Sequence, residues 1–121
     1  MLRSIGAVAA GYLIFGASAE LLFQLSGQAP HAPAPVAFKI AAIVWGAVFA
    51  LVAGWLTARV AGRRPILHAA VVAVLIALIA LASLVATPSA AHWSQVSAIV
   101  VMAPCALLGG VLSSRVRPED L

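Results

Sequence analysis

Residues 36–60 read VAFKIAAIVWGAVFALVAGWLTARV, a run in which only Lys39 and Arg59 carry charge. A helix over this run rises about 37 Å, at about 1.5 Å per residue, which exceeds the roughly 30 Å hydrocarbon core of a bilayer. Backbone groups in lipid must satisfy their hydrogen bonds within the segment, so a run of this kind is expected to be helical. The stretch therefore predicts a transmembrane helix.

Three further apolar runs accompany this one, and we expect spans over residues 4–25, 66–86 and 93–112. The composition of the 121-residue chain agrees, with 64% hydrophobic and 8% charged residues. A soluble domain has about 45–50% apolar and about 25% charged residues. The sequence predicts one all-α transmembrane domain over residues 1–121, folded as a four-helix bundle in a lipid bilayer.

The start of the chain also has features of a signal peptide. Arg3 precedes an apolar run, and Ala17-Ser18-Ala19 matches the small-residue pattern of a cleavage site. The apolar run continues beyond that pattern through residues 21–23, so we expect a retained first span.

Basic residues lie almost entirely on one side of the predicted topology. With four spans, one side holds Arg3, Arg59, Arg63, Arg64, Arg115 and Arg117, and the other holds only Lys39. The positive-inside rule then predicts cytoplasmic termini and a multi-pass protein of a bacterial inner membrane. Because these arginines flank apolar spans, the net charge of +4 indicates topology and not a nucleic-acid partner.

Small residues recur at every fourth position of the second span. They are Ala42, Gly46, Ala50, Gly54, Ala58 and Gly62. Residues four apart share a helix face, and small side chains let helices approach closely in lipid. We call this set the span-two ladder. It predicts a helix-packing face, either within the bundle or against another protein. The first span also has a small-residue face, through Gly6, Ala10, Ala17 and neighbouring Gly16.

One acid and one base lie inside the predicted spans near the non-cytoplasmic side. Glu20 precedes Gln24 by one turn in the first span, and Lys39 lies about one turn inside the second. Intramembrane acids are costly and usually face a partner or a pathway. We expect a Glu20–Lys39 ion pair that fixes the register of the two helices. Two alternatives are a functional carboxylate at Glu20 and a Lys39 side chain that reaches to the interface.

Metal, cofactor and catalytic signatures are weak in this sequence. His68 is expected on one side of the membrane, and His31 and His92 on the other. The single cysteine, Cys105, cannot form an intramolecular disulfide and is expected to be a packing residue. No phosphate-binding loop or nucleophile elbow occurs. We therefore expect no metal, no cofactor and no enzymatic activity.

Two resemblances follow from short motifs. Ala19-Glu20 resembles the corresponding dipeptide of the small multidrug resistance transporters, four-helix proteins whose helix-one glutamate binds substrate and protons within a dimer. That resemblance implies a transport role for Glu20, although residues 66–86 lack the Gly, Trp and Tyr that the family uses there.

The second resemblance covers most of the chain. Gly11-Tyr12, residues 62–65 (GRRP) before His68-Ala69, and Gly109-Gly110 resemble a class of small four-helix bacterial membrane proteins. This resemblance implies a four-helix membrane fold but no particular activity.

The sequence favours a non-enzymatic accessory or structural subunit that packs in the bilayer against itself or a larger membrane complex. Almost no mass lies outside the spans, so contacts are expected within the membrane. The alternative is a small proton-coupled transporter that uses Glu20.

Overall fold

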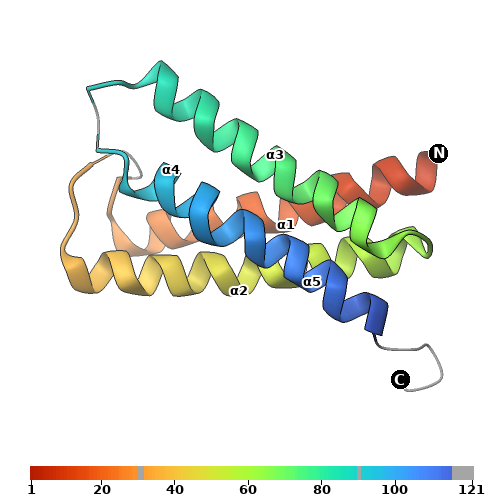
Figure 1. The fold of residues 1–121 in the computed structure, drawn as a ribbon. Coiled ribbons are helices and arrows are strands. Elements are labelled where there is room, and N and C mark those ends of the chain that lie inside the picture. The colour runs from red at the N-terminus through yellow and green to blue at the C-terminus, as the bar shows by residue number, and fades with distance from the viewer. Residues whose placement is uncertain (30–31, 90, 116–121) are drawn as a thin grey trace.

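A computed structural model of the chain describes residues 1–29, 32–89 and 91–115. The elements are α1 (Leu2–Ser26), α2 (Val36–Ala61), α3 (Pro65–Ala86), α4 (Trp93–Ser97), the π-helical turn η1 (Ala98–Met102) and α5 (Ala103–Arg115). The last three run end to end as one helical segment (Figure 1). Each of the four expected spans falls within one of these segments.

Across the part of the chain that the structure describes, four helical segments are long and apolar enough to cross a membrane. All regular structure in that part is helical. The prediction of an all-α four-helix bundle is confirmed, and the protein is a multi-pass integral membrane protein.

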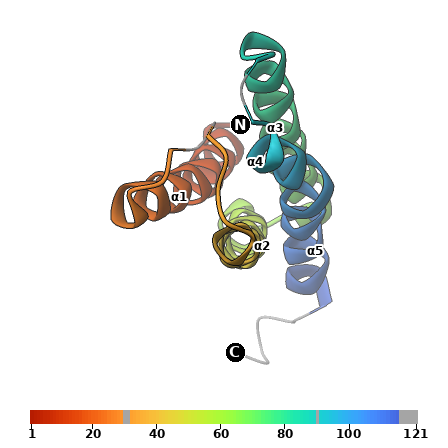
Figure 2. The ribbon, with the colours of Figure 1, turned by 90° about the vertical axis from the view of Figure 1, so that its left-hand side faces the viewer.

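Helix α2 occupies the centre of the bundle. Seen along the bundle, α1 lies on one side of α2 and the α3 and α5 pair on the other (Figure 2). The N-terminus, the α2–α3 turn and the end of α5 lie at one end (Figure 1). At the opposite end α3 leans away from α1 and α2. The helices are thus packed tightly at one end and spread at the other.

The interior is built from small side chains. Ala50, Ala53 and Ala106 are fully buried, and the largest fully buried side chains are only Val72 and Thr57. Lipid tails are as apolar as leucine, so burying larger side chains between helices gains little in a bilayer. Close backbone approach increases dispersion contacts instead. Larger Leu, Val and Ile side chains are exposed along all four segments, where they can contact lipid.

The span-two ladder packs inside the chain. A Cβ atom added at Gly54 would collide with the backbone carbonyl of Ala106, and one added at Gly46 would collide with the Met102 side chain. Ala42, Ala50 and Ala58 are also buried. The ladder therefore faces η1 and α5 of the same chain. This geometry corresponds to the bundle-packing interpretation and leaves little of the ladder for another protein.

Gly62, the last position of the ladder, has a different role. It is exposed and ends α2 with φ of 75°, a left-handed conformation that glycine adopts without strain. The Arg3 Nε donates a hydrogen bond of 2.6 Å to the Val60 carbonyl beside it. The start of α1 is thus tied to the end of α2.

The fourth segment contains an irregularity next to Pro104. Proline has no N–H to donate and its ring crowds the carbonyl four residues earlier, here Val100. The structure accommodates it with the π-helical turn η1 directly before α5. Such a turn inserts one extra residue and rotates the faces on either side of it. Ala98, Ala103 and Ala106, within this turn and after it, are all buried.

Candidate functional site

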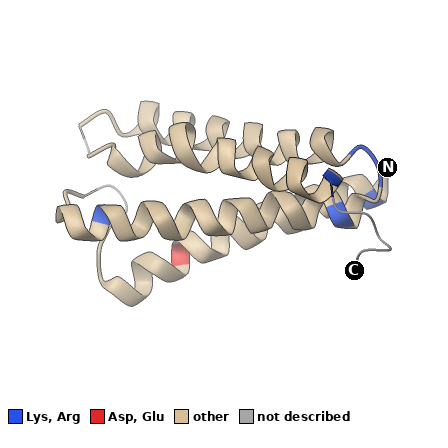
Figure 3. Ribbon diagram, turned by 60° about the horizontal axis from the view of Figure 1, so that its bottom comes forward, with Lys and Arg blue, Asp and Glu red and all other residues tan. Residues whose placement is uncertain are grey.

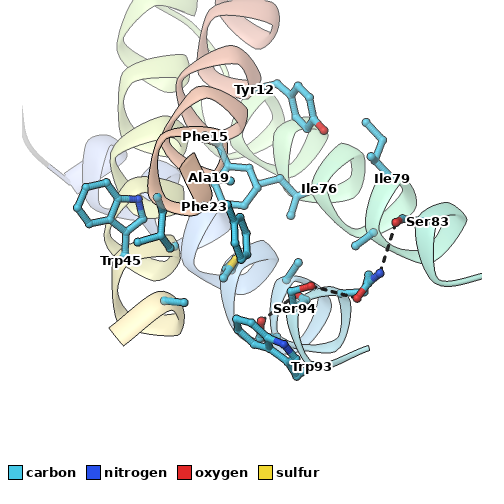
Figure 4. Close-up of a pocket in the computed structure, with 18 residues that line it drawn as sticks. Tyr12, Phe15, Ala19, Phe23, Trp45, Ile76, Ile79, Ser83, Trp93 and Ser94 are labelled. Carbon is cyan, nitrogen blue, oxygen red and sulfur yellow. Dashed lines mark hydrogen bonds between the residues drawn. The ribbon is translucent and has the colours of Figure 1, made fainter. Parts of the chain in front are cut away.

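A cavity of about 190 Å³ lies where α3 leans away from α1 and α2 (Figure 4). Its walls are mainly apolar and aromatic, with Tyr12 and Phe15 from α1, Trp45 from α2, Ile76 from α3 and Met102 from η1. Every residue that lines it is uncharged at neutral pH. A pocket of this kind suits an apolar group.

Polar groups from α3 and α4 form a chain on one wall of this cavity. Gln95 is buried, and its Nε2 donates a hydrogen bond of 3.4 Å to the Ser83 Oγ. The Ser94 Oγ donates to the Gln95 Oε1 at 3.1 Å (Figure 4). These three side chains join α3 to α4 across the region where the helices separate. They also give the cavity hydrogen-bonding capacity in an otherwise apolar lining.

Sequence reasoning missed Ser83, Ser94 and Gln95. The available signal was three polar residues, 94, 95 and 97, at the start of an otherwise apolar span. A buried polar side chain requires a hydrogen-bond partner, which points to the bundle interior. The identity of that partner depends on the packing of α3 against α4.

An aromatic cluster lies at the end of the bundle where the helices spread apart. Phe23, Phe38 and Trp93 have ring centroids 5.9–6.3 Å apart. The Trp93 Nε1 also donates a hydrogen bond of 3.1 Å to the Ala32 carbonyl in the α1–α2 loop. Trp and Tyr favour the membrane interface, where an amphipathic ring meets both lipid and polar groups. The cluster therefore marks one end of the membrane-embedded region.

The expected Glu20–Lys39 ion pair is not formed. Glu20 is exposed on α1, and its Oε1 accepts a hydrogen bond of 2.8 Å from the Gln24 Nε2. The physical reason is helix phase. Ser18 is buried, and two residues at about 100° each turn Glu20 about 200° away from the core. Lys39 is partly buried near the start of α2. The sequence places Glu20 and Lys39 on adjacent helices at comparable depth, but it does not show in which direction each side chain points.

Arginine residues gather at the end of the bundle that holds the N-terminus (Figure 3). The Arg59 guanidinium carbon lies 5.1 Å from the centroid of the Trp55 ring. Arg63, Arg64 and Arg115 are exposed, and Arg117 lies outside the described residues. The predicted anchors that can be placed thus share one end. Which side of the membrane that end faces stays a prediction from the charge distribution.

The histidines are held by separate local contacts. His68 is buried, and its Nε2 lies 2.9 Å from the Ser4 Oγ while its Nδ1 lies 2.9 Å from the Arg64 carbonyl oxygen. The His92 Nε2 lies 2.7 Å from the Thr87 carbonyl oxygen. His31 lies outside the described residues. Among the residues described, no group of three His, Cys, Asp or Glu side chains could hold a metal ion.

None of the family models, curated proteins or solved structures with which the chain was compared matches it.

Proposed function

We propose that this protein is a non-enzymatic subunit of a larger membrane complex, and that it docks through the outer face of α1. The observation that carries the proposal is the hydrogen-bonded Glu20–Gln24 pair, which is exposed on the side of α1 that faces away from the bundle.

The depth of Glu20 supports docking at this face. Helix α1 ends at Ser26, so Glu20 lies about 9 Å inside that end at about 1.5 Å per residue. The helix is about 37 Å long and the hydrocarbon core about 30 Å thick, which puts Glu20 about 5 Å within the hydrocarbon. A carboxylate facing lipid there is unfavourable, and Gln24 alone is a neutral partner. A protein surface that covers the pair would remove this cost.

Helix α1 also has a shape that another helix can approach. Cβ atoms added at Gly6 and Gly16 would meet nothing within 4 Å, whereas one added at Gly11 would collide with Thr57 of α2. Gly11 is therefore used for packing within the chain, and Gly6 and Gly16 are not. Ala17 is exposed one turn before Leu21 and beside Glu20. Small residues that flank a polar pair are typical of helix contacts in membranes.

The proposed occupant is a transmembrane helix of a different protein that presents a cation or a hydrogen-bond donor. A second copy, related by a two-fold axis along the membrane normal, would bring two Glu20 carboxylates together at equal depth. Like charges at close range are unfavourable. Lys39, the one lysine of this chain, lies on α2 and not on the outer face of α1. Charge complementarity thus favours a hetero-complex.

We further propose that the complex lies in a bacterial inner membrane, with the arginine-rich end and both termini in the cytoplasm. The alternative of a proton-coupled transporter has less support. Ala19 lines the cavity between the helices, but Glu20 does not. A carboxylate that couples protons to a substrate is expected to face the substrate pathway.

Photo-crosslinking in living cells tests this function. A photoreactive residue replaces Ala17 on the outer face of α1 or, as the matched lipid-facing control, Val100 in η1. We expect a crosslink from Ala17 alone, to a transmembrane segment with a basic or amide side chain within one turn of the crosslinked site. Glu20→Leu should abolish that crosslink without lowering the thermal stability of the purified chain. A crosslink only to a second copy, or equal crosslinking from Val100, contradicts the proposal.

A further inference from the structure

A second cavity, separate from the α1 face and from the cavity of Figure 4, lies on the outer side of the α2–α5 contact. It has a volume of about 490 Å³ and is lined by Leu51, Val52, Trp55, Leu112 and Arg115. We call it the α2–α5 groove. Four of its lining residues are apolar or aromatic, and the fifth, Arg115, is the last residue of α5 at the arginine-rich end. The groove therefore has an apolar part and a basic part.

Arg59 adds a second cation beside the groove. Its guanidinium lies over the Trp55 ring, 5.1 Å from the centroid, in a cation–π contact. Its Nη2 atom is buried and has no hydrogen-bond partner. A guanidinium has five N–H donors, and a buried donor without an acceptor is costly. Arg59 thus presents an unmet donor next to the indole that lines the groove.

The two arginines lack an opposite charge within the described part of the chain. No Asp or Glu carboxylate there lies within 4.0 Å of a guanidinium nitrogen of Arg59 or Arg115, and the one acid described, Glu20, is on α1. Trp55 connects the two arginines, because Arg59 stacks on its ring and Arg115 lines the same cavity as Trp55. Among residues 1–29, 32–89 and 91–115, no carboxylate therefore compensates the positive charge at this end of the groove.

We infer that the α2–α5 groove binds an acidic phospholipid. The phosphate accepts hydrogen bonds from Arg59 and Arg115, because guanidinium groups match the geometry of phosphate oxygens. An acyl chain lies along Leu51, Val52 and Leu112. The indole of Trp55 lies at the boundary between headgroup and chain, where tryptophan is favoured. A zwitterionic lipid fits less well, since its ammonium group would face two cations. Basic pockets between transmembrane helices recognise anionic headgroups for this reason.

Tryptophan quenching by brominated lipids tests the site. The chain with Trp45→Phe and Trp93→Phe retains Trp55 as its one tryptophan. It is reconstituted in phosphatidylcholine vesicles that contain a small fraction of brominated phosphatidylglycerol or, in parallel, the same fraction of brominated phosphatidylcholine. We expect stronger quenching by the acidic lipid, with a preference on the order of fivefold for each arginine that contacts it. Arg59→Gln combined with Arg115→Gln should bring the preference close to one.

The matched control is Arg63→Gln combined with Arg64→Gln. It removes the same charge from the same end of the bundle, but neither residue lines the groove. We expect this variant to keep the preference. Equal loss in both double variants would mean diffuse attraction to the surface and would overturn the site. Displacement of the lipid by millimolar inorganic phosphate would also overturn it, because the acyl chain would then contribute nothing.

A second measurement does not depend on the tryptophan substitutions. Native mass spectrometry of the wild-type chain, extracted with mild detergent, should show retained phosphatidylglycerol that is lost in the Arg59→Gln and Arg115→Gln variant and kept in the control. Retention of phosphatidylcholine to the same extent would contradict the inference. Neither measurement involves the outer face of α1. If the lipid site is refuted, the proposed docking function is therefore unaffected.

Discussion

Glycine residues in this chain have different roles that depend on the neighbour each one faces. Gly54 lies against the Ala106 carbonyl, so its lack of a side chain permits the close approach of α2 and α5. Gly62 ends α2 in a left-handed conformation. Gly6 has open space around the position of a Cβ atom. Helix propensity disfavours all interior glycines equally, so only the packing separates Gly54 from Gly6.

The same substitution at Gly54 and Gly6 should therefore have opposite effects. Gly54→Ala forces α2 and α5 apart and is expected to lower the free energy of unfolding by about 1–3 kcal/mol. Gly6→Ala meets no neighbour and should be neutral or stabilising by up to about 1 kcal/mol, because alanine favours helix. Thermal unfolding of both purified variants in detergent measures the difference. Equal stability of Gly54→Ala and wild type would show that the close approach is not required.

Individual helices differ in how much of their surface the bundle uses. Helix α2 contacts α1, α3 and α5, whereas α1 lies at the periphery and leaves one side exposed (Figure 2). Hydrogen bonds at the basic end compensate for this peripheral position. Arg3 bonds to the Val60 carbonyl, and Ser4 lies within hydrogen-bond distance of His68 on α3. The first turn of α1 is thereby held to both neighbouring helices.

We expect His68 and Ser4 to stabilise the bundle as a unit. His68→Leu leaves the Ser4 hydroxyl without its partner on α3 and should cost about 1–2 kcal/mol, and Ser4→Ala should cost about 1 kcal/mol. The double variant should be no less stable than His68→Leu alone, because the shared hydrogen bond is lost only once. Thermal unfolding of the wild type, the two single variants and the double variant measures the coupling energy between His68 and Ser4. Ser114→Ala is the control, since that hydroxyl donates to its own helix at Val111. Strictly additive losses would rule out the contact.

The molecule as a whole is basic at one end and apolar along its sides. Arginines gather at one end (Figure 3). The Phe23, Phe38 and Trp93 cluster lies near the other. The chain begins at the arginine-rich end and α5 also ends there (Figure 1). Charge asymmetry of this kind orients a multi-pass protein with its basic end in the cytoplasm.

Cysteine labelling tests this orientation. In a Cys105→Ser background, a membrane-impermeant maleimide added to intact spheroplasts should label Ala29→Cys and Ser89→Cys but not Ser114→Cys. All three positions are exposed, so accessibility within the protein does not distinguish them. Permeabilisation should then allow Ser114→Cys to react, which serves as the control. Labelling of Ser114→Cys from outside, with protection of the other two, would reverse the proposed orientation.

The number, type and limits of the spans could be predicted from the sequence because they depend on local properties. A long apolar run in lipid must satisfy its own backbone hydrogen bonds. Ranges such as residues 36–60 therefore form helices regardless of which helices pack against them. The ladder predicted close packing for a similar reason, since small residues four apart share one face. Neither property specifies which helix lies on the other side of the contact.

Only the tertiary structure decided which residues meet across helices. Met102, the last residue of the π-helical turn, and Ala106 of α5 are the neighbours of the ladder. Glu20 turned away from Lys39, a direction that sequence spacing between two helices does not define. The chain of Ser83, Gln95 and Ser94 joins α3 to α4 at the end where the helices spread apart. Position along a helix is a local property, but rotation about its axis depends on packing against all its neighbours at once.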